Sequence, residues 1–317
     1  MLQGLSNRIP LRTKYDFMRF RNYTIIASGI VCLIALILYV TVGLNYGVDF
    51  RGGIMVEIRA PQAIEMSTLR STLNRLNLGE VEIQQFGQPT DAIIRVESQE
   101  GDERAQLRAV ETIRNTLGPQ VDYRRVEFVG PKVGAELVRY GIIATFLTIL
   151  GIAIYVWFRF DWQFGVAAIV SILHDVMATI GLFAVTGMAF DLTSLAAVLT
   201  IAGYSINDTV VIFDRVRENL RKYKQMGLIE LINLSVNETL ARTILTTATT
   251  FLAVGCLALF GGPVIRGFSL AMLFGLIVGT YSTVYIAAPL VIYTGLKRVG
   301  RLVGEELPSG LAQEKMP

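Results

Sequence analysis

The sequence predicts a polytopic α-helical membrane protein with six transmembrane helices and one ferredoxin-like α+β (βαββαβ) periplasmic domain. Hydrophobic residues make up 52% of the 317 residues and charged residues only 17%, against about a quarter in ordinary soluble domains. Six apolar runs each reach the ~18 residues that a membrane-spanning helix requires. Between the first two runs, a more polar segment shows alternating strand and helix patterns instead.

The first apolar run covers residues 23–44 and follows an arm, residues 1–22, that carries five Lys and Arg residues. A signal-peptide core has only ~7–15 residues, and no cleavage site of small residues follows this run. We therefore expect an uncleaved first span. The other expected spans are about 137–158, 164–186, 192–213, 241–261 and 267–294, which together make a five-helix region over 137–296.

Basic residues indicate the orientation of these spans. Lys and Arg gather in the arm 1–22, in the loop 214–240 and in the tail 297–317, all on one side if there are six spans. Short loops rich in Lys and Arg remain in the cytoplasm. We expect a multi-pass protein of the bacterial inner membrane with both termini in the cytoplasm and residues 45–136 in the periplasm.

The periplasmic segment predicts a domain of its own. Its expected order is strand, helix, strand, strand, helix, strand, which is the ferredoxin-like arrangement. This fold names no function by itself, and we find no cluster of catalytic side chains, so we expect docking or gripping of a partner and no enzyme activity. The expected elements are 53–59, 65–77, 80–86, 91–97, 102–117 and 121–129.

Other classes of function find little support in the composition. A net charge of +3 is too small to indicate nucleic-acid binding. The chain has no phosphate-binding Gly-rich motif, and its one histidine, His174, and two cysteines, Cys32 and Cys256, have no zinc-ligand spacing. We expect no cofactor and no metal, and we interpret the cysteines as packing residues.

Charged residues inside the spans are the informative ones. A carboxylate in lipid costs at least ~2.5 kcal/mol, so such groups face the bundle interior and often mark ion pathways. Asp175 and Asp208 are such groups, with His174 beside the first and Arg242 at a depth that allows contact with the second. We interpret the four as a proton relay; the alternative is a structural hydrogen-bonded cluster. Adjacent helical residues diverge by about 100°, so we expect at most one of His174 and Asp175 to face a partner.

Polar neighbours could extend this relay. The candidates are Ser205, Asn207, Thr246 and Thr247, although the threonines are equally explained as interhelical packing residues. In the last span, Gly275 and Gly279 form a GxxxG pattern, which predicts close approach of another helix. The weakly amphipathic stretch 229–240 is expected to lie on the membrane surface.

Several blocks resemble the SecD/SecF family. The first is Gly47-Val-Asp-Phe-Arg-Gly-Gly53, which contains Asp49, Arg51, Gly52 and Gly53. Similar blocks follow in the order of the family over most of residues 45–296, which makes the combination specific. They are 129–135, His174-Asp175, 191–194, 203–219, 237–243 and 260–263.

This resemblance implies more than the residues alone establish. It implies a member of the resistance-nodulation-division superfamily that pairs with SecD, joins the SecYEG channel, often with YajC, and uses the proton-motive force to pull preproteins outward after SecA. The preprotein would meet the periplasmic domain. It also implies that Asp208 and Arg242 serve proton conduction.

Two other functions remain open at this point. A small-molecule exporter subunit of the same superfamily would share the intramembrane carboxylate but should carry large paired outer domains. A non-conducting assembly factor would tolerate Asp208→Asn without loss of secretion. A membrane enzyme is a more distant third, because no catalytic constellation is found.

Overall fold

The computed structural model describes residues 14–296 except 80, 86, 100 and 102, so parts of the expected arm 1–22 and the expected tail 297–317 lie outside the described residues. Contacts divide the chain into two compact units. One consists of residues 43–147 and 186–196, and the other, within the described residues, of residues 14–42, 148–185 and 197–296. Each unit is described by itself.

The first unit contains a four-stranded sheet. A short helix, α3 (Val48–Arg51), precedes it, and the order along the chain is then strand, helix, strand, strand, helix, strand. The strands lie in the order β2-β3-β1-β4 and each neighbouring pair is antiparallel. The ferredoxin-like prediction is therefore confirmed. The elements are β1 (Gly53–Arg59), α4 (Met66–Asn74), β2 (Val81–Gln85), β3 (Asp91–Val96), α5 (Glu103–Leu117) and β4 (Asp122–Val129).

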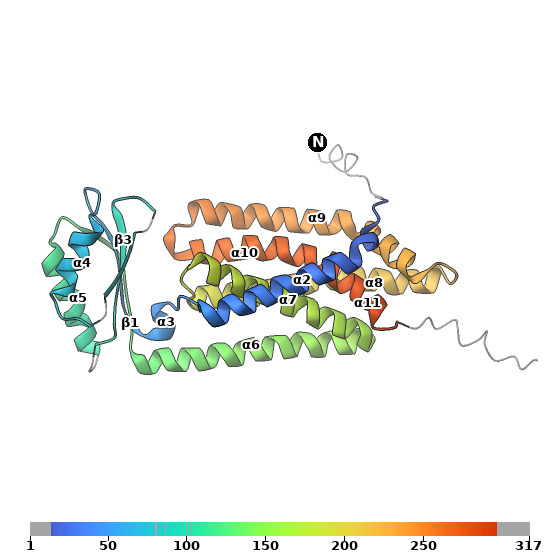
Figure 1. Ribbon diagram of the computed structural model, residues 1–317, viewed down its shortest axis with the longest axis horizontal. Helices are drawn as coiled ribbons and strands as arrows, with labels where there is room; N and C mark the ends of the chain where they lie inside the picture. Colours follow the sequence, from blue (N-terminus) through green and yellow to red (C-terminus); the bar gives the residue numbers. More distant parts are fainter. Residues whose placement is uncertain (1–13, 80, 86, 100, 102, 297–317) are drawn as a thin grey trace, which may run out of the picture. The chain divides into compact units, whose positions relative to one another are not determined.

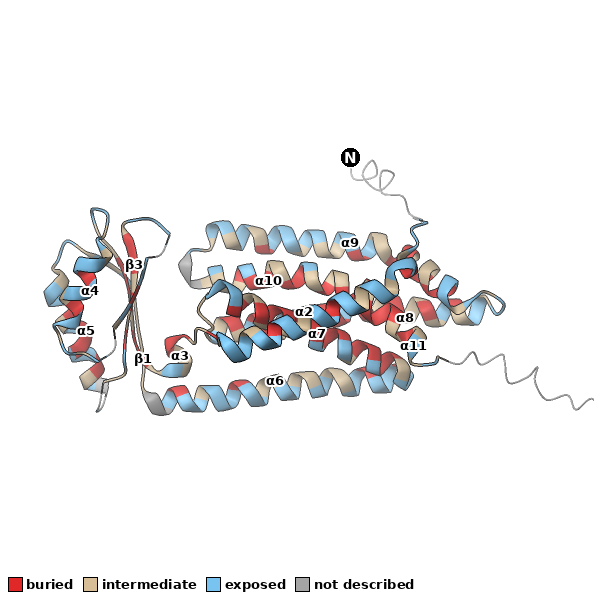
Figure 2. Ribbon diagram, viewed as in Figure 1, coloured by how far each residue is buried: buried red, intermediate tan, exposed pale blue. Residues whose placement is uncertain are grey.

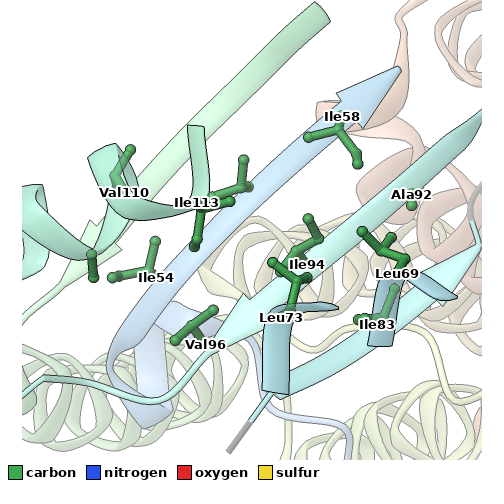
Figure 3. Close-up of a cluster of buried hydrophobic side chains, with 12 residues drawn as sticks. Ile54, Ile58, Leu69, Leu73, Ile83, Ala92, Ile94, Val96, Val110 and Ile113 are labelled. Carbon is green, nitrogen blue, oxygen red and sulfur yellow. The ribbon is translucent and has the colours of Figure 1, made fainter. Parts of the chain in front are cut away.

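Alternation along the strands builds the core of this unit. On β1, Ile54, Val56 and Ile58 are almost completely buried, and they lie opposite Val96, Ile94 and Ala92 of β3. Helices α4 and α5 cover one face of the sheet (Figure 1). Their apolar side chains, such as Leu73 and Ile113, complete the cluster shown in Figure 3. Period-two strands and helices with one apolar face produce this arrangement directly.

Within the described residues, six helices are long and apolar enough to cross a membrane. The last of them is continued by a π-helical turn, η2 (Thr283–Ala287), and α11 (Ala288–Tyr293). The protein is a multi-pass membrane protein. The helices are α2 (Arg21–Thr41), preceded by the turn η1 (Phe17–Phe20), α6 (Pro131–Arg159), α7 (Trp162–Thr186), α8 (Leu192–Lys222), α9 (Leu228–Phe260) and α10 (Pro263–Ser282).

The six helices differ sharply in burial. The apolar windows of α7, α10 and α8 are 61%, 56% and 44% buried, whereas those of α2, α9 and α6 are only 11%, 11% and 6% buried. Figure 2 shows the same contrast, with buried residues concentrated on α7, α8 and α10. Polar side chains on these three helices therefore meet away from lipid.

The segment 214–240 differs from the expected loop. Helix α8 continues to Lys222 and α9 already begins at Leu228. The stretch 229–240 does not lie free on a surface, because Leu231 and Val236 are completely buried and Arg215 Nε of α8 donates to Glu238 Oε2 at 2.7 Å. Charged and polar contacts between α8 and α9 thus extend both helices beyond their apolar spans.

Candidate functional site

Asp175 lies at the centre of a buried polar cluster. Its side chain is completely buried on α7. Oδ2 accepts hydrogen bonds from Ser205 Oγ of α8 at 2.6 Å and from Ser282 Oγ at the end of α10 at 2.7 Å. His174 Nδ1 lies 3.0 Å from Oδ1. One carboxylate therefore joins the three most buried helices.

The histidine behaves differently from the sequence expectation. His174 and Asp175 were expected to diverge, yet the imidazole folds back onto the neighbouring carboxylate. Both side chains are buried, and the His174 ring lies 6.2 Å from the ring of Tyr281. The rotation of 100° per residue separates the Cβ atoms, but it does not separate the ends of long side chains. Asp175 thus has a titratable neighbour.

Two glycines of α10 allow this close packing. A Cβ at Gly275 would lie 2.3 Å from Ile201 Cδ1, and a Cβ at Gly279 would lie 3.3 Å from Ser205 Cβ. The GxxxG pattern therefore brings α10 against α8, as predicted. The approach is what allows Ser205 and Ser282 to reach the same oxygen of Asp175.

Asp208 occupies a second position on α8. Its side chain is 3% exposed, and the groups that act on its carboxylate are the guanidinium of Arg242 and the hydroxyl of Thr246, both on α9. Within the described residues no ion pair of 4.0 Å or less joins Asp208 to Arg242, and Arg242 is exposed. The two predicted partners are thus neighbours that are not in direct contact.

The structure brings only some of the expected relay neighbours to these carboxylates. Ser205 contacts Asp175 directly, whereas Thr247 Oγ1 lies 3.1 Å from Thr280 Oγ1 of α10. The Thr246 hydroxyl is a hydrogen-bonding partner of Asp208, and Thr246 Oγ1 also lies 3.1 and 3.0 Å from the carbonyl oxygens of Arg242 and Thr243 in its own helix. Asn207 is exposed.

The block that contains Asp49 forms a compact junction with the turn between α7 and α8. The Gly47 amide donates to Phe190 O at 2.9 Å, and the Leu192 amide at the start of α8 donates to Asp49 Oδ2 at 3.0 Å. Carboxylates are favourable at helix N-termini. The rings of Phe50 and Phe190 stack with centroids 5.9 Å apart.

Glycine is required at two positions of this block. Gly52 and Gly53 have φ of 74° and 116°, which side-chain-bearing residues rarely adopt. A Cβ at Gly53 would also lie 2.5 Å from Val96 O. Arg51, by contrast, is exposed at the end of α3. The backbone conformation therefore explains both glycines. Arg51 N donates to Gly47 O at 3.2 Å, and within the described residues its side chain forms no ion pair of 4.0 Å or less.

Two family models match this chain. The family described as "SecD/SecF GG Motif" matches residues 40–63, and the family described as "Protein export membrane protein SecD/SecF, C-terminal" matches residues 109–297. The chain belongs to the SecD/SecF family.

Relatives and solved structures of the SecD/SecF family agree over most of the chain. The protein named protein translocase subunit SecF from Rickettsia rickettsii is 44% identical over 286 residues, which cover 89% of this chain and 92% of the relative. The protein of the same name from Cereibacter sphaeroides is 44% identical over 300 residues, covering 92% of this chain and 93% of the relative.

The similar solved structures are larger. The crystal structure of SecDF from Thermus thermophilus, described as a translocon-associated membrane protein, matches with a TM-score of 0.82 and 34% identity. A structure of SecDF in a super-membrane-facing form matches with a TM-score of 0.66 and 35% identity. Each match covers 92% of this chain but only 41% of the SecDF chain.

Sequence reasoning missed Ser282 and the π-helical turn that follows it. Pro289 has no N–H and cannot donate to the carbonyl of Tyr285, four residues earlier. That carbonyl instead accepts a hydrogen bond from Thr24 Oγ1 of α2 at 3.3 Å. π-helical turns are frequent at functional sites. In this SecD/SecF chain, the proline inside an apolar span was the available signal.

Proposed function

We propose that the chain acts with SecD in the bacterial Sec protein-export machinery and uses the proton-motive force to promote export of preproteins. Family membership and the names of the relatives support this role. The chain corresponds to 41% of the SecDF chain. A separate SecD would supply the part of SecDF that has no counterpart here.

The placement in the cell is part of the same proposal. Basic residues at one end of the helices favour an inner-membrane protein with both termini in the cytoplasm. The domain over residues 45–136 then lies in the periplasm, where it meets the translocating preprotein. SecYEG and YajC are the expected membrane partners, and SecA acts before this step from the cytoplasm.

The observation that carries the proton-coupled step is the arrangement of Asp208 and Arg242. Asp208 is buried, and Arg242 is near enough to act on its charge without pairing with it. With the cation at this distance, the carboxylate can hold a proton. Closer approach of Arg242 would stabilise the charged form and favour proton release. Relative movement of α8 and α9 would therefore accompany each cycle of proton binding.

Asp175 supplies a second proton-binding group in this proposal. Two hydroxyls donate to one of its oxygens, and His174 lies beside the other. These contacts hold the Asp175 carboxylate between α7, α8 and the end of α10. Ser205, which contacts Asp175, lies three positions before Asp208 on α8. Helix α8 therefore links the two carboxylates.

A double-mutant cycle tests the relay. Asp208→Asn and Arg242→Gln are compared singly and together for preprotein export at matched expression. If the two residues form one relay, the double variant is no slower than the slower single variant. Independent, additive defects would contradict the relay. Unchanged export in Asp208→Asn would favour the non-conducting assembly factor.

A further inference from the structure

A polar cavity of about 420 Å³ lies where α6 ends and α8 leaves its apolar span. Four of its six lining side chains are cationic and two are carboxylates, which leaves an excess of two positive charges. The lining residues are Arg159, Asp214, Arg217, Glu218, Arg221 and Lys222.

Contacts within the fold hold two of the lining arginines in place. Arg159 Nη2 donates to Asp214 Oδ1 at 2.6 Å, and Arg217 Nη1 donates to Arg159 O, in the last residue of α6, at 2.9 Å. Both guanidinium groups also lie over the ring of buried Phe160, at 4.9 and 5.4 Å from its centroid. These two arginines are fixed by defined partners.

The other two lining cations, Arg221 and Lys222, have no carboxylate paired with them inside the cavity. The carboxylate of Glu218 pairs with Arg215 at 2.5 Å, so it is already engaged. Arg221 and Lys222 are exposed. Within the described residues neither forms an ion pair of 4.0 Å or less, and the Lys222 ammonium lies over the ring of Tyr223 at 5.1 Å from its centroid. These two cations therefore remain available to an anion.

The rings beside this cavity indicate its depth in the membrane. Trp157, Phe158 and Trp162 surround the end of α6 and the start of α7, and they are 73%, 88% and 56% exposed. Exposed tryptophans on membrane helices lie at the level of the lipid headgroups. The cavity is thus at the depth of phosphate groups, and the neighbouring rings offer an apolar surface to acyl chains.

We propose that this cavity binds the headgroup of an anionic phospholipid. Its volume is within the ~300–1,000 Å³ of small-molecule sites, and basic pockets between membrane helices bind anionic headgroups. Arg159 and Arg217 are held by their partners in the fold, while Arg221 and Lys222 neutralise the phosphate. The exposed rings favour a lipid over free phosphate, because acyl chains can pack against the rings and inorganic phosphate cannot.

Lipid binding to the purified full-length chain in detergent tests this proposal. Native mass spectrometry measures retention of phosphatidylglycerol, of zwitterionic phosphatidylcholine and of inorganic phosphate. The cavity variant is Arg221→Gln/Lys222→Gln. The control is Lys14→Gln/Arg19→Gln, which removes two positive charges that are also exposed but lie outside the cavity.

We expect phosphatidylglycerol to bind more tightly than phosphatidylcholine. The cavity variant should weaken the binding of phosphatidylglycerol by about thirtyfold. The control should change binding less than threefold. Equal losses in the two variants would show unspecific charge attraction and overturn the proposal. Phosphate that displaces the lipid at equal concentration, or equal retention of the two lipids, would also overturn it. Arg221→Glu alone provides a second variant, which should weaken phosphatidylglycerol at least tenfold.

Discussion

The Ser282 hydroxyl of α10 donates a hydrogen bond to Asp175 Oδ2 of α7 at 2.7 Å, between residues 107 positions apart in sequence. Ser282 is the last residue of α10 before the π-helical turn Thr283–Ala287. The irregular backbone near Pro289 therefore begins directly after a donor to a buried carboxylate. The backbone irregularity before Pro289 and the hydrogen bond between Ser282 and Asp175 therefore lie next to each other on the same helix.

Replacement of Ser282 by Ala should weaken the cluster. Asp175 would keep the Ser205 donor but lose the other hydroxyl, so we expect a loss of about 1 kcal/mol in stability and slower export. Thermal unfolding in detergent and an export assay measure the two effects. Ser269→Ala is the matched control, since Ser269 is equally buried on α10 but donates only to Ile265 O of its own helix. Equal effects of both substitutions would contradict the role of Ser282.

Replacement of Gly275 by Ala should separate α10 from α8. The added Cβ would lie 2.3 Å from Ile201 Cδ1, and such overpacking costs about 1–3 kcal/mol. Gly255→Ala is the control, because nothing lies within 4 Å of a Cβ at that position of α9. Thermal unfolding of both variants gives the comparison.

A second substitution shows whether the clash is the cause. Ile201→Ala removes the atoms that a Cβ at Gly275 would meet. Combined with Gly275→Ala, it should be less destabilising than the sum of the two single effects. Additive losses would mean that the glycine acts in another way.

Acid should remove one stabilising interaction of the sheet domain. Arg59 donates to both oxygens of Asp91 at 2.6 and 2.5 Å, and these bonds hold the pKa of Asp91 below its ordinary value. The charged form is stabilised in the folded state. This contribution is therefore present above the unfolded pKa of about 3.9 and is lost as the pH falls through the lower folded pKa.

Urea unfolding of residues 45–136, a segment that we expect to fold alone, measures this effect. Asp91→Asn should be less stable than wild type at about pH 7, and the difference should shrink toward about pH 2. A difference that is equal at both pH values would contradict the ionic account.

Glu57 should have the opposite effect on the same domain. Its side chain is 5% exposed, and burial raises the pKa of this carboxyl despite the nearby arginines, Arg125 first among them. The folded state therefore binds the proton more tightly than the unfolded state, so the contribution to stability is lost as the pH rises through the folded pKa. Glu57→Gln should accordingly raise the urea midpoint at about pH 7 and have less effect at about pH 3. A lower midpoint at neutral pH would show that the charge is well compensated.

The periodic parts of this fold could be predicted from the sequence. Alternation at residues 53–59 and apolar spacing at 102–117 identify a strand and a helix because each buries one face. Charge runs, however, do not reveal that α9 begins at Leu228, since that depends on contacts with α8 such as Arg215–Glu238. The polarity of residues 214–240 predicts a loop, but packing between α8 and α9 makes most of this segment helical.

The site was predictable only where a residue is unusual for its surroundings. Asp175 and Asp208 are conspicuous because ionisable groups are rare in apolar spans. Ser282 is not conspicuous, because serine is common at helix contacts in membranes. Its role appears only when α10 is placed against α7. Likewise, sequence depth allowed an Asp208–Arg242 contact but could not show that the two side chains remain apart.

The central claim is that Asp208 couples export to the proton gradient. Export into inverted membrane vesicles that contain the full machinery is measured with and without the gradient, at matched expression. Wild type and the control Glu230→Gln, which changes an exposed carboxylate of α9, should both be accelerated by the gradient. We expect Asp208→Asn to export at the wild-type rate without the gradient and to gain no rate from it. Acceleration of Asp208→Asn by the gradient to the same degree as wild type would contradict the account.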